Sequence, residues 1–220
     1  MALSDFLLNT DYPIDKVIYR SSIFSMSLAA YDYQPASFAH GNGGIFLPLA
    51  QWSFSPTFAS GVYDIGTSPV SSGVTLYNGD VTVDATNINY AFQNNTPSPV
   101  VVYFRVVGLA IPGSDRSVPG TSEYQDLVLN TDNNYLKIVS EGQGDVNNTQ
   151  SLTITHGLGY LPKTLVWSSF DGGTTIFRVD GMGRDFLYGD SGNLVTVSAS
   201  SVIITNLFGV TLKYYYKVYG

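Results

Sequence analysis

The sequence contains no cysteine and few charged residues. The absence of cysteine excludes disulfide bonds, thiolate zinc sites and cysteine nucleophiles, although it does not identify the cellular compartment. Charged residues make up 12% of the chain, about half the usual share. The formal net charge is −7 without any basic cluster. This argues against nucleic-acid binding, because contacts to phosphates need lysine and arginine.

Long hydrophobic runs are missing as well. No stretch approaches the roughly 18 apolar residues that a membrane-spanning helix requires. Residues Met1 to Phe6 do not combine a basic region with an apolar stretch, so we expect no secretory signal. The sequence therefore predicts a protein that does not insert into membranes. We expect it to be made and kept in the cytoplasm, or to be released by a route other than secretion.

The residues that are abundant are typical of β-structure. The chain has 16 tyrosines, 12 phenylalanines and 22 glycines, with much threonine, valine, serine and asparagine. Aromatic and β-branched residues favour strands, whereas glycine and asparagine favour tight turns. The chain has 220 residues, of which 44% are hydrophobic. It can therefore bury the core of one large domain, or of two domains of about a hundred residues each.

The two halves of the sequence resemble each other. Short segments recur in the same order, and the offset between copies is 121 residues at the first pair and 112 at the last. The matching pairs are Leu8–Asp11 with Leu129–Asp132, Ala39–Gly43 with Thr155–Gly159, Trp52–Ser53 with Trp167–Ser168, Tyr77–Asp80 with Tyr188–Asp190, and Tyr103–Gly108 with Tyr215–Gly220. Two Pro-Gly pairs mark a linker between the copies. We therefore predict an all-β protein of two tandem β-sandwich or jelly-roll-like domains of similar topology, residues 1–110 and 123–220, joined by a linker at 111–122.

The clearest strand pattern lies at the C-terminal end of the chain. Every second residue there is apolar or aromatic, and these residues form one face of the expected strand. The other face carries Lys213, Tyr215, Lys217 and Tyr219. A period of two residues indicates a half-buried strand. We expect these four residues to be partly solvated or covered by a partner, in a subunit interface.

Other segments predict shorter elements. Strands are expected at residues 74–76, 81–83, 194–199 and 202–205. The dipeptide Asn78-Gly79 between the first two is a strong signal for a hairpin turn. The best helix candidate is the short segment at residues 25–30. Short strands separated by frequent turns favour a sandwich or a jelly-roll-like barrel.

One segment resembles a catalytic motif. Gly189-Asp190-Ser191-Gly192 is similar to the nucleophile segment of chymotrypsin-like serine proteases, in which the serine needs a nearby histidine held by a buried aspartate. Asn193 replaces the glycine that usually follows, and His156 lies only 35 residues before Ser191. The first copy has no serine at the matching position. We interpret the segment as a hairpin turn and expect no catalytic residues and no enzymatic activity.

The only two histidines, His40 and His156, occupy matching positions in the copies. A metal site would need further ligands at suitable spacing. None is present, and we expect neither a metal nor another cofactor. We predict instead that each histidine ends a strand and hydrogen-bonds locally, while glycines turn the chain. The residues assigned to these turns are His40, Gly41, His156, Gly157, Gly159 and Pro162.

Two further kinds of site stay open. Asp145, Asn147 and Asn148, and the similar cluster at residues 132–134, offer the oxygen ligands that calcium prefers, although they also suit ordinary Asx turns. The tyrosines could form a sugar-binding face, because aromatic rings stack on pyranoses. They could equally belong to the core and to subunit interfaces, and we favour an interface.

The segment from Leu152 to Lys163 resembles one that is common in tail and fibre proteins of tailed bacteriophages. In that family a strand ends in a His-Gly or His-Asn turn, followed by Leu-Gly-Tyr, a proline and a second strand that ends in aromatic residues. This chain has His156-Gly157 at the turn and Pro162 after it. The first copy departs from the pattern, because Asn42 stands where the second copy has Leu158.

The resemblance implies a virion component that works by assembly and contact rather than by catalysis. Such a protein would assemble in the host cytoplasm, and its partners would be other virion proteins and copies of itself, with trimers favoured. We expect a place on the tail, tail tip or fibre, and attachment to a host glycan or receptor is open. A capsid decoration protein and a carbohydrate-binding module are the alternatives. We expect the first copy to anchor the protein to the particle and the second to project.

Overall fold

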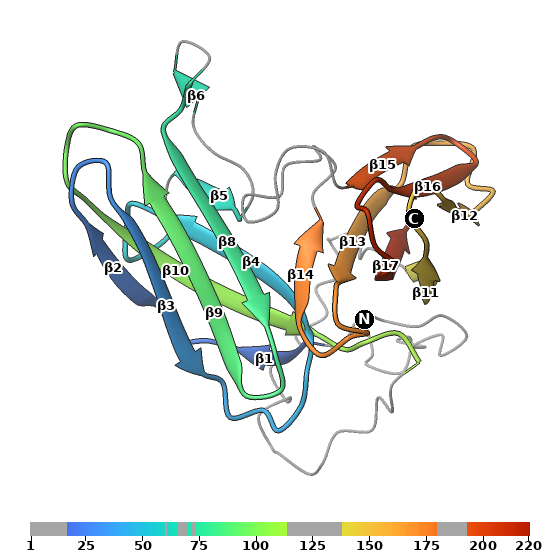
Figure 1. Cartoon of the computed structure of the whole chain (residues 1–220), viewed down its shortest axis with the longest axis horizontal. Helices are drawn as coiled ribbons and strands as arrows, with labels where there is room; N and C mark the ends of the chain where they lie inside the picture. Colours follow the sequence, from blue (N-terminus) through green and yellow to red (C-terminus); the bar gives the residue numbers. More distant parts are fainter. Residues whose placement is uncertain (1–16, 60, 66–69, 72–73, 114–137, 180–192) are drawn as a thin grey trace, which may run out of the picture.

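The computed structural model describes residues 17–59, 61–65, 70–71, 74–113, 138–179 and 193–220, and within these ranges the chain forms strands and no helix (Figure 1). The strands of the first half are β1 (Val17–Arg20), β2 (Phe24–Leu28), β3 (Tyr33–Ala39), β4 (Leu47–Ser53), β5 (Val62–Asp64), β6 (Val70–Ser71), β7 (Val74–Thr75), β8 (Tyr77–Val83), β9 (Asn87–Asn94) and β10 (Val100–Leu109). Those of the second half are β11 (Ile138–Val146), β12 (Ser151–Thr155), β13 (Lys163–Ser169), β14 (Ile176–Val179), β15 (Asn193–Val197), β16 (Ser201–Asn206) and β17 (Leu212–Tyr219). Their pairings are antiparallel. The predicted all-β fold is confirmed.

Two layers of strands enclose the core of the first half. In one layer the central strand is β10, which pairs with β4 on one side and with β1 and β2 on the other, and β5 lies beyond β4. Strands β8, β9 and β3 form the facing layer. Trp52, Phe92 and Phe104 are buried between the layers. Residues alternate along each strand, so one face of each layer supplies this aromatic core.

The second half repeats this order of pairing. Its central strand is β17, which pairs with β11 on one side and with β13 on the other, and β14 lies beyond β13. Strands β15, β16 and β12 form the facing layer. The core between the two layers includes Val166, Val202, Ile204 and Tyr214. The two halves therefore have a similar topology, as the repeated segments of the sequence predict.

A single sheet of seven strands connects the two halves. Strand β14 of the second half pairs with β8 of the first, with Ile176 opposite Val83 and Phe177 opposite Thr82. The sheet therefore has the order β11-β17-β13-β14-β8-β9-β3. Two separate tandem domains are not confirmed, because this ladder runs through both halves. Of the predicted linker, only residues 111–113 lie within the described chain.

The predicted helix at residues 25–30 is wrong. Residues Phe24–Leu28 form strand β2, in which Met26 and Leu28 are buried and the alternating Ser25 and Ser27 are exposed. This alternation has the period of a strand, and pairing with β10 satisfies the backbone. Tertiary pairing outweighs the weak helix preference of so short a segment.

The predicted hairpin turn at Asn78-Gly79 is also wrong. Strand β8 runs straight through both residues, and the chain turns later, between β8 and β9. A Cβ on Gly79 would lie 2.5 Å from the ring of Phe92. Glycine is required at this position because a buried aromatic ring packs against the backbone, and not because the chain reverses direction.

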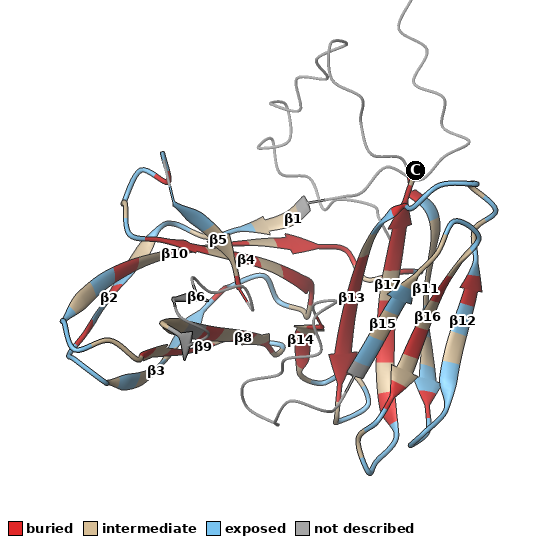
Figure 2. Cartoon of the chain, turned by 90° about the horizontal axis from the view of Figure 1, so that it is seen from above, coloured by how far each residue is buried: buried red, intermediate tan, exposed pale blue. Residues whose placement is uncertain are grey.

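The strands expected near the C-terminus are confirmed, with one difference. Strands β15 and β16 lie where the alternation predicts them, and β17 covers the final segment. The last strand is buried on both faces rather than half-buried, as the red colour of β17 in Figure 2 shows. Tyr214 and Val218 point into the core of the second half, whereas Tyr215 and Tyr219 join a cluster between the halves.

The two tryptophans that the sequence comparison matches, Trp52 and Trp167, do not occupy equivalent positions in the two halves. Trp52 lies opposite Phe104 and belongs to the core of the first half. Trp167 lies opposite Tyr215 and belongs to the cluster between the halves. Since neighbouring residues of a strand point to opposite faces, a register difference of one residue turns the second tryptophan outward from its own half.

Candidate functional site

His40 ties the end of β3 to the β8–β9 hairpin. Its backbone N–H donates to the carbonyl oxygen of Thr86 at 3.0 Å, and its Nε2 lies 3.0 Å from the carbonyl oxygen of Asp84. A carbonyl oxygen can only accept, so Nε2 carries the proton. Nδ1 then accepts from the backbone N–H of Asn42 at 3.1 Å. Both ring nitrogens are used in local contacts.

His156 makes the same three contacts in the second half. Its backbone N–H donates to the carbonyl oxygen of Ser200 at 3.0 Å, and its Nε2 lies 3.2 Å from the carbonyl oxygen of Ser198. The backbone N–H of Leu158 donates to Nδ1 at 3.3 Å. The local hydrogen bonding that the sequence predicts for both histidines is therefore present.

Glycines turn the chain after both histidines. Gly41 and Gly43 have φ angles of 66° and 70°, and Gly157 and Gly159 have 62° and 76°. Glycine adopts this left-handed region without the steric cost that a side chain brings. Pro162 is buried at the end of the second turn. The two turns are thus equivalent in backbone conformation as well as in hydrogen bonding.

Sequence reasoning missed a second pair of equivalent residues, Asn94 and Asn206. Both are fully buried, and each side-chain amide donates to two carbonyl oxygens at 2.7 and 2.8 Å. Each therefore closes the loop that follows its strand. The available signal was their spacing of 112 residues, which also separates Tyr103 from Tyr215.

The face that the sequence assigns to a subunit interface is covered by the chain itself. Tyr215 and Tyr219 are 3% and 5% exposed, and Lys217 is fully buried. Both tyrosines pack in a cluster that includes Leu47 of the first half. Only Lys213 is partly exposed, with its Nζ 5.6 Å from the centre of the Tyr215 ring. This prediction is corrected, because the two halves pack against each other at this face.

Polar contacts accompany this junction. The indole Nε1 of Trp167 donates to the carbonyl oxygen of Pro48 at 2.8 Å, which links β13 to β4. Arg178 on β14 lies 3.7 Å from the carboxylate of Asp64 on β5. These contacts fix the second half against the first, so the junction is an internal surface of the chain.

The remaining sequence candidates do not form a site within the described chain. Ser191 and residues 132–134 lie outside the described residues. Asn147 serves a turn, because its amide donates to Gln150 at 3.1 Å and its oxygen accepts from the Thr211 hydroxyl at 2.8 Å. Within the described ranges, no three histidine, aspartate or glutamate side chains gather as metal ligands.

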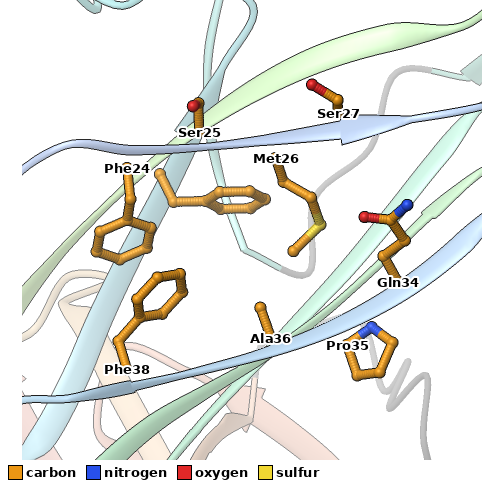
Figure 3. A pocket seen from close by; sticks show the side chains of 9 residues that line it. Phe24, Ser25, Met26, Ser27, Gln34, Pro35, Ala36 and Phe38 are labelled. Atoms are coloured by element: carbon orange, nitrogen blue, oxygen red, sulfur yellow. The ribbon is translucent and has the colours of Figure 1, made fainter.

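A hollow of about 360 Å³ opens between β2 and β3. These consecutive strands belong to opposite layers, and in the described chain each borders its layer, β2 next to β10 and β3 next to β9. The hollow is lined mainly by Phe24, Met26, Gln34, Ala36, Phe38 and Phe104 (Figure 3). We call residues 23–39, which include both strands and the loop between them, the β2–β3 edge.

Aromatic rings form one wall of this hollow. Phe24 stacks on Phe38 with ring centres 4.4 Å apart, and Tyr90 meets both rings edge-on at 4.9 and 5.6 Å. Burial raises the pKa of Tyr90, so its phenol stays protonated. Such stacked and edge-on pairs hold the side chains in place. The wall is therefore a formed surface and does not need a ligand to order it.

The surface around the hollow is apolar and almost uncharged. Ile23, Tyr31 and Phe38 are 47%, 70% and 36% exposed. Asp32 is the only charged residue between positions 21 and 63, and its carboxylate accepts from the side-chain amide of Gln34 at 2.9 Å. Edge strands usually carry charges that discourage association. This edge has few, so it is the best candidate for a contact surface.

Comparisons with protein families, curated proteins and solved structures find no match for this chain. In the part of the chain that the structure describes, there is no helix long and apolar enough to cross a membrane. Function is therefore inferred from the residues of the chain itself.

Proposed function

We propose that this chain is a non-enzymatic structural component of a tailed-phage virion, placed in the tail, tail tip or fibre. The observation that carries the proposal is the β2–β3 edge, an exposed and apolar surface on a chain with a net charge of −7. Clustered exposed apolar residues mark surfaces that bind other proteins. The protein would act by holding such contacts in a particle.

The segment that resembles phage tail and fibre proteins supports the virion assignment. It includes β12, the His156 turn and the start of β13, and it crosses from one layer of the second half to the other. Tyr160 and Leu161 are 52% and 69% exposed in this crossing. The turn thus offers apolar side chains to the outside while its histidine and glycines hold the backbone.

The β2–β3 edge belongs to the first half, which supports an anchoring role for that half and a projecting role for the second. A deletion of residues 123–220 is a poor test, because it would expose Leu47 and Leu109 at the junction. Point substitutions at exposed residues of the full chain avoid this difficulty. Tyr31→Asp should lower incorporation into particles, whereas Leu194→Asp in the second half should not.

Antibody labelling of purified particles tests the location. We expect gold label on the tail, tip or fibre. Label on the head lattice would replace this proposal with the alternative of a capsid decoration protein. If the chain is absent from particles altogether, the virion proposal is wrong.

A carbohydrate-binding module is the second candidate, because the same edge carries an exposed aromatic ring, Tyr31, and a hydrogen-bonding side chain, Gln34, that lines the hollow. Aromatic rings beside hydrogen-bonding groups can stack on sugars. Glycan-array binding that Tyr31→Ala abolishes would favour this function. An array without binding, together with firm incorporation into particles, would favour the structural one.

A further inference from the structure

We propose that the β2–β3 edge binds a second copy of this chain. This inference deepens the proposed function, on which it rests, by naming the partner of the contact surface. The hollow of about 360 Å³ would receive apolar side chains of the neighbouring copy. This volume lies at the small end of the range for binding sites, which is about 300–1,000 Å³.

Charge favours a second copy as the occupant. Each chain carries a net charge of −7, so two copies repel each other where their acidic surfaces meet. Residues 21–63 contain one charged residue, Asp32, and include the whole β2–β3 edge. Contact at this edge brings two acidic chains together with little repulsion. Charge depletion with aromatic residues and methionine is also the composition of interface cores.

Hydrogen bonding along β3 argues against an added peptide strand. The carbonyl oxygen of Asp32 accepts from Asn94, and the N–H of His40 donates to Thr86, so even-numbered residues of this segment face β9. In an antiparallel sheet, the backbone N–H and C=O groups of successive residues point alternately to the two sides of the strand. The groups of the odd-numbered residues of β3 therefore point away from β9.

Pro35 belongs to this outward set and has no N–H to donate. A strand added to β3 would meet a gap in the middle of its ladder. The contact that this edge supports is therefore made by side chains in and around the hollow. The exposed apolar groups of the edge that can supply it are Ile23, Tyr31, Tyr33 and Phe38.

Molecular mass in solution tests the proposal with the full chain. Sedimentation of the wild-type protein at concentrations up to about 100 μM should show self-association, since this range detects contacts of micromolar strength. Tyr31→Asp should weaken it at least tenfold, because a charge then faces the partner. Tyr31 has a φ of 53°, a conformation that aspartate tolerates well, so this variant should fold.

Leu194→Asp and Val210→Asp are the matched controls, because both residues are about half exposed and lie in the second half. They should leave the mass unchanged. A monomeric wild type would overturn the proposal, and so would equal dissociation by the controls. Neither result bears on antibody labelling of particles, so failure of this inference is distinguishable from failure of the proposed function.

Crosslinking gives a second readout, because the chain has no cysteine of its own. Ser27→Cys places one thiol on the outer face of β2, beside the hollow (Figure 3), and Ser200→Cys places one on an exposed turn of the second half. A short bismaleimide should join copies of the first variant and not of the second. Equal crosslinking of both, or none at Ser27→Cys, would contradict a contact at this edge.

Discussion

The two halves share their order of strands, and they differ at β2 of the first half and its equivalent in the second half, β11. Phe24 of β2 lies opposite Phe104, and at the equivalent place Gly142 of β11 lies opposite Tyr216. A Cβ on Gly142 would meet the hydroxyl of Tyr216 at 2.6 Å. The second half thus fills this space from within, whereas the first half leaves a hollow lined with aromatic rings.

The hairpin turns beside the histidines differ in a similar way. Asp84 begins the turn of the first half, and Ser198 begins that of the second. The carbonyl oxygen of each accepts from its histidine, but only the first has a carboxylate. The duplicated scaffold is held by equivalent backbone contacts, and the differences lie in side chains that change what each half presents.

Substitution at the junction should have the largest effect. Trp167→Ala removes a fully buried ring between the halves and its hydrogen bond to Pro48. It should lower the free energy of unfolding by about 3–5 kcal/mol. Trp167→Phe keeps most of the packing and should cost less. Urea denaturation followed by circular dichroism measures both.

The Trp167→Phe variant also tests whether the halves unfold together. Its one remaining tryptophan, Trp52, lies in the core of the first half. Fluorescence then reports the first half, while circular dichroism reports both. Coincident transitions are expected from the shared sheet. Separate transitions would show that the halves are independent despite the β8–β14 pairing.

A glycine substitution in the first half should have an intermediate effect. Gly79→Ala places a methyl group 2.5 Å from the buried ring of Phe92 and should destabilise the protein by about 1–3 kcal/mol. Gly144→Ala in the second half is the control, since its nearest neighbour is Leu152 at 3.8 Å. Thermal unfolding should separate the two variants, and equal stability would contradict the packing described for Gly79.

Local patterns in the sequence predict the strands and the histidine turns, and long-range pairings escape them. Alternation near residues 194–205 identifies β15 and β16, and the His-Gly turns repeat in both halves. Asn78-Gly79 misleads because the ring that packs on Gly79 comes from β9. The pairing of β14 with β8 leaves no local pattern, because neither strand encodes its neighbour.

The candidate contact surface has a signal in the sequence that is easily overlooked. Asp32 is the only charged residue from position 21 to 63. This depletion shows that the segment is unusual, but burial in a core would explain it equally well. Which strands border a layer follows from the complete pairing order, so exposure of the edge could not be predicted.

The smallest expected effect distinguishes the two hairpin turns by their response to acid. Burial acts in the opposite direction, but hydrogen bonds from Thr86, Asn87 and Asn89 lower the pKa of Asp84 from 3.8 to about 2. A carboxyl with a lowered folded-state pKa stabilises the fold above its unfolded pKa, and this contribution is lost as the pH falls from about 4 to 2. Because the carboxylate is partly exposed, we expect Asp84 to contribute less than about 1 kcal/mol to the free energy of unfolding. Asp84→Ser introduces the residue that the second half has at the equivalent position, Ser198. This variant should lose less stability than the wild type between pH 6 and pH 2.5, and the two losses of unfolding free energy should differ by less than about 1 kcal/mol. An unchanged difference would mean that the carboxylate does not hold the turn of the first half.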